Sequence, residues 1–421
     1  MFLTEFEGLA QPGADPAAVA RARAKLLTEW LQTRAQELFS ELLEKRPTLL
    51  TPGLCVVTRT PDVQEVLLND RVFTVKPYTA RMERTTGAFI LGMARDARYD
   101  RELSALRLAA DRSDLDRVAA IARRSAEALV REAAPGRRLN LADGYARQVA
   151  LAVIAEYYGT PGPDGATIAR WLRALFRDIF LNLGNDPEVS AAADDAAAGL
   201  RGYLEPLIAE KRKRGPDAEP AADVLTRLAQ LRQGDSWVLD EDGVRRNIGG
   251  VIVGALETVN KAFVQAFDQL AHEPEALERA RRALLEGDEA TVLDAVMEAM
   301  RFNPQNPFLY RVCEESYTLA RSTEREVTIP AGTLVFAATA AAMCDPAFVA
   351  SPQEFRLGRA PEAQLFFGHV WHACFGRHVA PVEFLELAKP LLRLDGLRHV
   401  AGAPGQIQYE GPYPTSLWME W

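Results

Sequence analysis

The sequence predicts a mainly α-helical protein with a minor β component. Segments rich in Ala, Leu, Arg and Glu recur along the 421 residues, with apolar positions at helical spacing. The longest covers residues 240–274, and its apolar run at 248–256 predicts a helix buried on all sides. Strand-like segments are short and lie mainly late in the chain, at 325–340 and 407–421.

Earlier segments are predicted as helices from their amphipathic spacing and from the Pro or Gly residues at their ends. They are 15–47, 114–133, 143–159, 167–184 and 190–215. Residues 54–60 predict a strand, and 62–70 predict a short helix after it. The sequence PDAEP at 216–220 predicts a loop between helices. We therefore expect a single domain over residues 1–421.

Composition excludes several classes of protein. The formal net charge is −9 and the chain has no basic tail, so nucleic acid is not an expected partner. The four cysteines include no CxxC pair, which favours a reducing, cytoplasmic location. The N-terminus lacks the basic and apolar regions of a signal peptide, and no run of 18 apolar residues predicts a membrane span.

The predicted buried helix carries an acid beside an alcohol, Glu257 and Thr258, in the sequence GALET. A buried carboxylate is costly unless something uses it. A helical Thr tends to bond back to the preceding turn, and Gly254 makes a distortion easier. The pair suits proton delivery. Taken alone, such a pair is more often a packing Thr beside a Glu that reaches solvent.

Two further motifs follow the long helix. Glu298 and Arg301, in the sequence EAMR, lie three residues apart and so share one helix face. Their apolar neighbours indicate burial, where an ion pair must be well hydrogen-bonded, but the spacing alone is also that of an ordinary surface pair. Residues 344–359 form a turn-rich coil with two prolines and two phenylalanines.

The last motif is FFGHVWHACFGRH, which surrounds Cys374 with aromatic residues, glycines and histidines. A helix is predicted directly after it, and a helix N-terminus stabilises a thiolate. Because no partner cysteine or catalytic dyad accompanies Cys374, its thiolate could serve as a metal ligand. The alternative is an ordinary buried cysteine.

In their order and spacing, these four motifs resemble the cytochrome P450 family, over essentially the whole chain. That family's Cys loop reads F-G-x-G-x-H/R-x-C-x-G, and the matching positions are Phe367, Gly368, His372, Cys374 and Gly376. Val370 replaces the second glycine, and a β-branched residue resists positive φ. The resemblance implies the cytochrome P450 fold, with haem buried between the long central helix and the Cys loop.

The resemblance implies haem b (iron protoporphyrin IX) as the cofactor, with Cys374 as the axial ligand of the iron. A thiolate ligand pushes electron density onto the iron and favours O–O cleavage. The other cofactor-binding residues it implies are Phe367, Gly368 and Gly376 in the loop, and Arg311, His372 and Arg107 at the haem propionates. For Arg107 the match is incomplete, because Leu103 stands where the family has an aromatic residue.

The resemblance also assigns roles to the two acid-containing motifs. Glu298 and Arg301 match the family's buried structural pair, with Arg359 as a third partner. Thr258 and Glu257 match its oxygen-activating pair. Thr258 would hold a water against bound O2, and Glu257 would help to relay protons.

An apolar pocket with few polar groups is expected over the haem, which implies a hydrophobic small-molecule substrate. Its predicted lining residues are Phe89, Phe180, Val253, Leu256, Phe308, Leu309 and Tyr413. Lys76, Arg81 and Arg84 precede this lining in the sequence. They could bind a substrate carboxylate, although solvated loop charges are the commoner case.

Early helices carry a set of basic residues that, in this fold, would border the face behind the cysteine: Arg98, Arg101, Arg107, Arg112, Arg117, Arg123 and Arg124. A basic face would steer an acidic ferredoxin or flavodoxin. The sequence contains no Cys cluster or flavin fingerprint, so electrons are expected from a separate protein.

The leading functional hypothesis is a monooxygenase that inserts one oxygen atom from O2. The alternative is a peroxide-dependent haem-thiolate enzyme, either a peroxygenase or a hydroperoxide-rearranging enzyme. The Glu257–Thr258 pair favours the first, because a peroxide route needs no O2 proton relay. A third hypothesis, a non-enzymatic helical binding protein with a packed Cys374, predicts a colourless purification.

Overall fold

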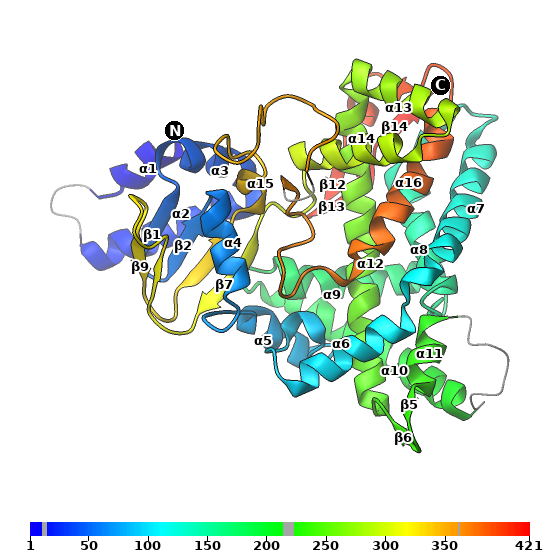
Figure 1. The fold of residues 1–421 in the computed structure, drawn as a ribbon, viewed down its shortest axis with the longest axis horizontal. Helices are drawn as coiled ribbons and strands as arrows, with labels where there is room; N and C mark the ends of the chain where they lie inside the picture. Colours follow the sequence, from blue (N-terminus) through cyan, green and yellow to red (C-terminus); the bar gives the residue numbers. More distant parts are fainter. Residues whose placement is uncertain (11–14, 214–222, 361–362) are drawn as a thin grey trace. The chain divides into compact units, whose positions relative to one another are not determined.

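The computed structural model describes residues 1–10, 15–213, 223–360 and 363–421 (Figure 1). The loop predicted at 216–220 lies outside the described residues. The chain forms two compact units, the first of Met1–Ala80 with Asn306–Cys374 and the second of Arg81–Gln305 with Phe375–Trp421. The single domain expected over residues 1–421 stays a prediction.

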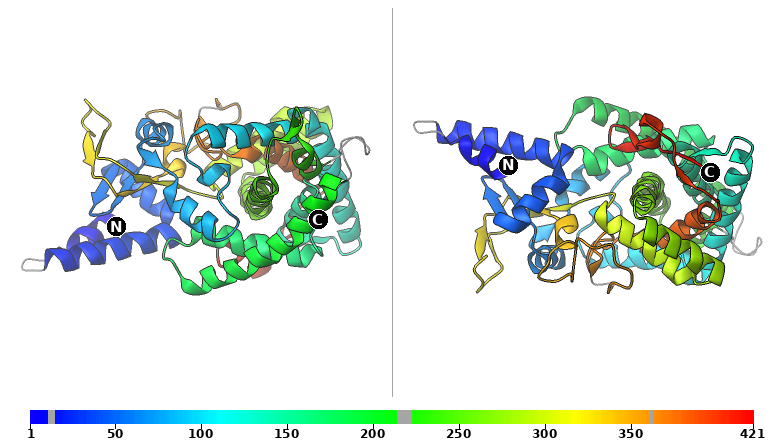
Figure 2. Two further views of the ribbon diagram at one scale, coloured as in Figure 1. Left: turned by 90° about the horizontal axis from the view of Figure 1, so that it is seen from below. Right: turned by 90° about the horizontal axis from the view of Figure 1, so that it is seen from above.

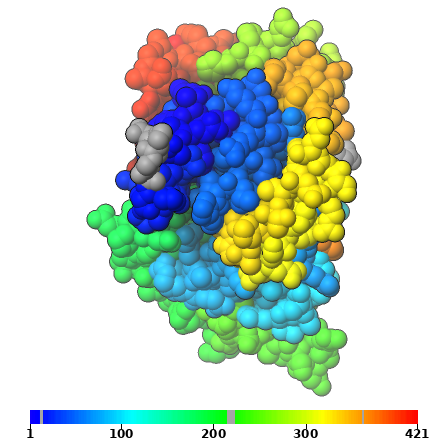
Figure 3. Space-filling view, turned by 90° about the vertical axis from the view of Figure 1, so that its left-hand side faces the viewer, coloured from blue at the N-terminus to red at the C-terminus, as the bar shows by residue number. Residues whose placement is uncertain are grey.

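The first unit combines early helices with a five-stranded sheet of order β1-β2-β10-β7-β3. Neighbours β2 and β10 are parallel, and the other neighbours are antiparallel. The strands are β1 (Thr48–Thr51), β2 (Leu54–Val57), β3 (Phe73–Thr74), β7 (Leu309–Cys313) and β10 (Leu334–Ala337), with a separate hairpin of β8 (Tyr317–Leu319) and β9 (Val327–Ile329). Figure 3 shows the early part of the chain, in blue, beside the later strands, in yellow.

Helices of this unit share a core with the sheet, in which Val63, Val66 and Leu67 lie with Val335 and Ala337. The helices are α1 (Phe2–Gly8), α2 (Pro16–Thr33), α3 (Ala35–Lys45), α4 (Thr60–Leu68) and α15 (Thr339–Ala342), while α5 (Lys76–Arg84) begins here and ends in the second unit. The helix predicted at 15–47 is broken at Arg34, whose φ of −142° is not helical. The Arg34 guanidinium instead lies 4.6 Å over the Phe2 ring and pairs with Glu37.

The second unit holds the remaining long helices. They are α6 (Ala97–Ala109), α7 (Leu115–Ala133), α8 (Arg147–Glu156), α9 (Gly165–Phe176), α10 (Pro187–Lys213), α11 (Val224–Gln230), α12 (Glu241–Ala271), α13 (Pro274–Glu286), α14 (Glu289–Phe302) and α16 (Val379–Leu392). π-helical turns, η3 (Ala142–Ala146) and η4 (Arg177–Leu181), precede α8 and follow α9. A three-stranded sheet joins β11 (Arg398–His399), β14 (Trp418–Glu420) and β4 (Arg138–Asn140), and a hairpin joins β12 (Gln408–Glu410) to β13 (Tyr413–Ser416).

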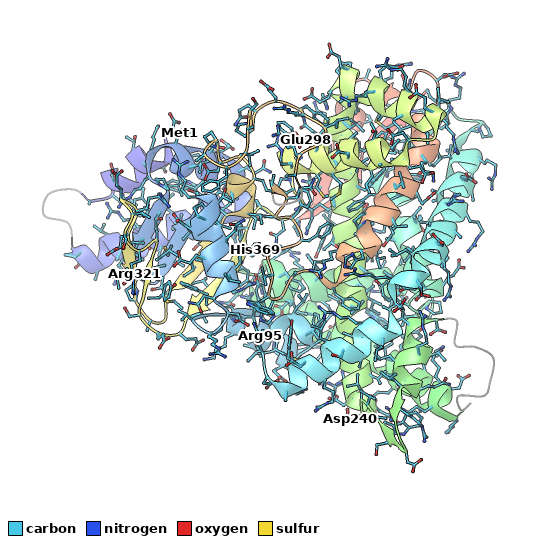
Figure 4. The ribbon with its side chains drawn as sticks, viewed as in Figure 1. Met1, Arg95, Asp240, Glu298, Arg321 and His369 are labelled. Atoms are coloured by element: carbon cyan, nitrogen blue, oxygen red, sulfur yellow. The ribbon has the colours of Figure 1, made fainter. Side chains whose placement is uncertain are left out.

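Helix α12 runs through the middle of the second unit, and Figure 2 shows it end-on among its neighbours. It begins at the N-cap Asp240 (Figure 4), whose carboxylate accepts a hydrogen bond of 2.7 Å from the Gly243 amide. Helices α8, α9, α10, α14 and α16 pack against it. Apolar contact on nearly every side explains why its sequence lacks a continuous polar face.

The fold class is confirmed as mainly α with a minor β component. The late strands fall where the sequence predicts them, as β9 and β10 within 325–340 and as β12 to β14 within 407–421. None of the described helices combines the length and the hydropathy that crossing a bilayer requires.

Candidate active site

The Cys loop of the first unit folds back on itself. The Cys374 amide donates a hydrogen bond of 2.8 Å to the Phe367 carbonyl, and the Gly368 amide donates one of 3.0 Å to Leu365. Gly368 has φ of +77°, and a Cβ there would make only ordinary contacts, so its backbone angle is the reason for a glycine. No disulfide joins the described cysteines.

Val370, which stands where the family has a glycine, has positive φ. Its φ is +46°, and His372 follows at +54°. A β-branched residue in the left-handed region costs roughly 1–2 kcal/mol. The replacement of glycine by valine predicts resistance to this backbone, and the loop adopts positive φ at Val370 despite that preference.

Arg311, on β7, is a buried cation, and Asp70 acts on it through charge without forming an ion pair among the described residues. It is 4% exposed, and its guanidinium donates to the Tyr310 carbonyl at 2.9 Å and bonds with the Tyr78 side chain. Burial lowers the pKa of Arg311. Among the described residues no carboxylate lies within ion-pair distance of it. A buried guanidinium of this kind needs an anion, and a haem propionate would supply one.

In the second unit, Glu257 is buried and held by basic groups from distant parts of the sequence. It is 2% exposed, and Arg147 contacts both its oxygens, from Nε at 2.9 Å and from Nη2 at 3.1 Å. Asn260 donates to it at 3.3 Å, and the Arg173 Nε lies 3.6 Å away. Glu257 therefore does not reach solvent, which excludes the simplest alternative for this motif.

Thr258 bonds back to the preceding turn, as the sequence predicts, by donating its hydroxyl hydrogen to the Gly254 carbonyl. Gly254, Ala255, Thr258 and Lys261 are only half-buried, whereas the residues between them are fully buried. At 100° per residue these four share one side of α12. A Cβ on Gly254 would meet nothing within 4 Å. This side of α12, on which the Thr258 hydroxyl lies, is therefore its less covered side, and we call it the open side.

Lys261 is a residue of this open side that the motifs do not indicate. Burial lowers its pKa to about 8, and no hydrogen bond or ion pair of its side chain occurs among the described residues. Its sequence signal is a lone lysine in the otherwise apolar stretch VNKAFV. Arg147 gives a similar signal in YARQVALAV, because a single arginine in an apolar helix needs a buried anion.

Glu298 and Arg301 form the buried pair that their apolar neighbours indicate. Both nitrogen–oxygen distances are 2.9 Å, and the two side chains are 2% and 1% exposed (Figure 4 labels Glu298). Arg359, in the first unit, donates to the carbonyls of Ala350, Ser351 and Glu354 and so ties the 344–359 coil together. Its role as a third partner of the pair stays a prediction.

Several predicted pocket residues of the second unit are already engaged in packing. The Phe89 ring lies against Gly250 of α12, where a Cβ would overlap it, and Phe180 contacts Phe176 at 4.8 Å between ring centroids. Tyr413 donates to the Arg173 carbonyl at 2.9 Å. Val253 and Leu256 are fully buried on α12, away from the open side.

In the first unit, Phe308 packs on Phe39 and Phe336, and Leu309 is half-buried. For all of the predicted lining residues, the role in the pocket stays a prediction.

The basic residues near this lining have partners of their own. Lys76 pairs with Glu314 in the first unit. In the second unit, Arg81 donates to the Asn182 carbonyl and to Asn185, and Arg84 pairs with Asp178 and Asp194. Arg81 and Arg84 are therefore not available to a substrate carboxylate without breaking these bonds, whereas the Lys76 side chain is 68% exposed and agrees with a solvated loop charge.

The expected basic face is narrower than its sequence indicates. Arg98, Arg123 and Arg124 pair with Glu102, Glu386 and Glu156, and Arg117 donates to the Glu156 carbonyl. Arg101 and Arg107 are exposed without an acidic partner among the described residues, and Arg112 donates to the His378 Nε2 at 2.8 Å. Burial, Arg112, Arg377 and Arg107 lower the pKa of His378. We call Arg107, Arg112 and Arg377, which all act on His378, the arginine cluster.

The sequence model of the family described as "Cytochrome P450" matches residues 171–388. Mycinamicin IV hydroxylase/epoxidase of Micromonospora griseorubida is 31% identical over 63% of this chain and 62% of its own length. Cytochrome P450 monooxygenase PikC of Streptomyces venezuelae is 30% identical over 68% and 62%. The matched part thus spans about three fifths of these relatives.

Solved structures share the fold over nearly the whole chain. CalO2 superposes with a TM-score of 0.78 over 93% of this chain and 96% of that one, at 21% identity. Cytochrome P450 TbtJ1 gives 0.76 over 94% and 96%, also at 21% identity. The family match covers more than half of the residues and includes the α12 and ExxR motifs and Cys374. The chain therefore belongs to the cytochrome P450 family.

Proposed function

We propose that this chain is a haem-thiolate monooxygenase that inserts one oxygen atom from O2 into a hydrophobic small molecule. Proteins of the family bind haem b through a Cys thiolate, so haem b is the cofactor. The observation that carries the proposal is the Cys loop, which keeps positive φ at Val370 and at His372. Strained backbone of this kind clusters at binding and catalytic sites.

The residues of the first unit fit a haem. Cys374 would provide the thiolate ligand of the iron, in a loop shaped by Phe367 and Gly368. Arg311 suits a haem propionate because its buried guanidinium forms no ion pair among the described residues. The remaining cofactor contacts that we propose are His372, Gly376 and Arg107. When bound, the haem supplies the activation of O2, which protein side chains alone do not provide.

The chain itself must deliver protons, because inserting one oxygen atom consumes O2, two electrons and two protons and releases one water. The Thr258 hydroxyl donates to Gly254, so its lone pairs can still accept a hydrogen bond from a water on the open side of α12. Glu257 must exchange a bond with Arg147 before it can relay a proton. Lys261, with a pKa of about 8, can also exchange protons near neutral pH.

A hydrophobic substrate agrees with the apolar residues proposed to line the pocket. The relatives carry names that refer to mycinamicin IV and to vitamin D(3). Electrons are proposed to come from a separate acidic ferredoxin or flavodoxin that docks on the arginine cluster, so turnover should fall as salt screens these exposed charges. The cytoplasmic location stays a prediction.

The ferrous carbon monoxide spectrum tests the haem-thiolate assignment. Cys374→Ala and Cys374→His should lose the thiolate-type spectrum, whereas Cys344→Ala is a matched control that should keep it. A thiolate spectrum retained by both Cys374 variants would assign the ligand to Cys55, Cys313 or Cys344. Colourless protein that takes up no haem would support the non-enzymatic hypothesis.

Thr258→Ala tests the monooxygenase assignment. Its folding and haem content should stay unchanged, since the lost hydroxyl is small and half-buried. Product per electron should fall by up to about 10²-fold with a ferredoxin system, because positioned proton delivery is worth roughly 10²–10⁴-fold. Unchanged coupling would remove Thr258 from the proton route.

One observation favours the peroxide-dependent alternative: Glu257 is tied to Arg147 and not to Thr258. Full turnover of the unmodified protein with peroxide alone, together with unchanged coupling in Thr258→Ala, would replace the monooxygenase assignment with this one.

A further inference from the structure

We propose that the end of α12 and strand β11 bind a divalent transition-metal ion of the Zn²⁺ type through Asp268, His272 and His399. This proposal is independent of the haem chemistry. All three residues belong to the second unit and are described there. They supply a carboxylate and two imidazoles. This donor set suits Zn²⁺, whereas Mg²⁺ prefers oxygen ligands.

The three side chains converge although they come from two elements. Asp268 and His272 lie four residues apart, at the last turn and C-cap of α12, and His399 lies on β11. The His399 Nε2 is 2.9 Å from the Asp268 Oδ1. One donor atom of each residue lies within 4.8 Å of the donor atoms of the other two. Tetrahedral zinc with bonds of about 2.1 Å needs donors roughly 3.4 Å apart, so a small contraction completes the site.

Hydrogen bonding orients one of the ligands in advance. The His272 Nδ1 lies 2.8 Å from the Asp268 backbone carbonyl. The same Nδ1 lies 3.9 Å from the Asp268 Oδ1, so this contact holds the His272 ring beside the carboxylate. Metal-binding histidines are typically oriented by hydrogen bonds of this kind. The two imidazole rings lie 4.6 Å apart between centroids, a separation that two protonated rings would oppose.

Exposure of the cluster allows an ion to reach it. The His272 side chain is exposed, while Asp268 and His399 are partly buried, with about a fifth of each side chain exposed. Protein would thus supply three ligands, and water a fourth. The ion would also link the end of α12 to the sheet of β11, β14 and β4. In that sheet His399 of β11 is the strand partner of Met419, and Met419 of β14 is the strand partner of Leu139.

The experiment uses haem-loaded, full-length protein that has been freed of adventitious metal by a chelator and then of the chelator. Titration calorimetry with Zn²⁺ should give one site per chain in the micromolar range or tighter, and Mg²⁺ should give none. Zn²⁺ should also raise Tm by roughly 2–5 °C. Binding should weaken as pH falls, because imidazole must be neutral to bind a metal.

Variants identify the ligands. His399→Gln, His272→Gln and Asp268→Asn should each weaken Zn²⁺ binding by at least about 10-fold, the loss typical of disturbing a metal site. His378→Ala, which removes a histidine elsewhere in the same unit, should bind Zn²⁺ as the unmodified chain does. Haem content and circular dichroism verify the folding of each variant. Absence of binding below roughly 100 μM, or equal affinity in all variants, would reduce the cluster to a helix cap that favours positive charge at a C-terminus.

Discussion

Two buried carboxylates of the second unit are each neutralised by one arginine, but the two arginines lie at very different distances along the sequence. Glu298 and Glu257 are each 2% exposed, and each is contacted at both oxygens by one arginine. The partner of Glu298 is three residues away on the same helix, whereas Arg147 is 110 residues from Glu257. The first pair can form with its helix. The second exists only after α8 has packed on α12.

The two arginines also differ in how completely they are buried. Arg301 is 1% exposed and is among the largest fully buried side chains, whereas Arg147 is 5% exposed. Loss of Arg301 would therefore leave a hole in the core beside a buried carboxylate, whereas Glu257 retains Asn260 and Arg173 nearby if Arg147 is lost. Removing one arginine should therefore be more damaging at the local pair than at the distant one.

Arg301→Ala should cause the largest loss. It leaves a buried carboxylate without its bidentate partner, which typically costs about 3–5 kcal/mol. We expect haem-poor protein and a lower free energy of unfolding in denaturant titration. Arg124→Ala, which removes an exposed pair with Glu156, is the control and should change stability by less than about 1 kcal/mol. Stable, haem-replete Arg301→Ala protein would show that the pair is dispensable.

Arg147→Ala should cost less, about 2–3 kcal/mol, because Arg173 and Asn260 still face Glu257. The double variant Arg147→Ala/Glu257→Gln should recover part of this loss, since it removes the stranded charge. A double-mutant cycle measures the coupling directly. If Arg147→Ala proves as damaging as Arg301→Ala, the neighbouring groups do not share the charge.

Glu383, on α16, is a third buried carboxylate, and its Oε2 has no hydrogen-bond partner among the described residues. Burial raises its pKa from the ordinary 4.5 to about 8. The native state thus holds a proton that the unfolded state releases, so the free energy of unfolding should fall as pH rises from about 4.5 to about 8. Glu383→Gln should flatten this slope and raise stability at pH 8 by a few kcal/mol, since each pKa unit is worth about 1.4 kcal/mol. An unchanged pH profile would show that Glu383 is ionised in the native state.

Val370→Gly should give the smallest change, a gain of roughly 1 kcal/mol. Glycine relieves the positive φ of +46° but adds freedom to the unfolded chain. The Tm of haem-loaded protein measures the difference. A lower Tm would mean that packing of the Val370 side chain outweighs its backbone strain.

The comparison of the two carboxylates also explains what the sequence could predict. The i, i+3 spacing of Glu298 and Arg301 fixes their geometry once α14 forms, and the limits of α12 follow from the acidic residues at its start and from Pro274 after its end. Arg147 is not predicted as the partner of Glu257, because nothing local relates two segments 110 residues apart. The break at Arg34 has a similar cause, since the Phe2 ring that it covers lies in α1.

The parallel pairing of β2 with β10 has a consequence for synthesis of the chain. Leu54 pairs with Leu334, so the first unit cannot complete its sheet until most of the polypeptide has left the ribosome. At roughly 5–20 residues per second, the β1–β2 hairpin waits about 15–60 s with an open, apolar edge. All of the second unit between residues 81 and 305 emerges during that interval. We therefore expect chaperones to bind mainly the N-terminal 80 residues of the nascent chain. A nascent chain stalled before residue 334 should be the species that aggregates.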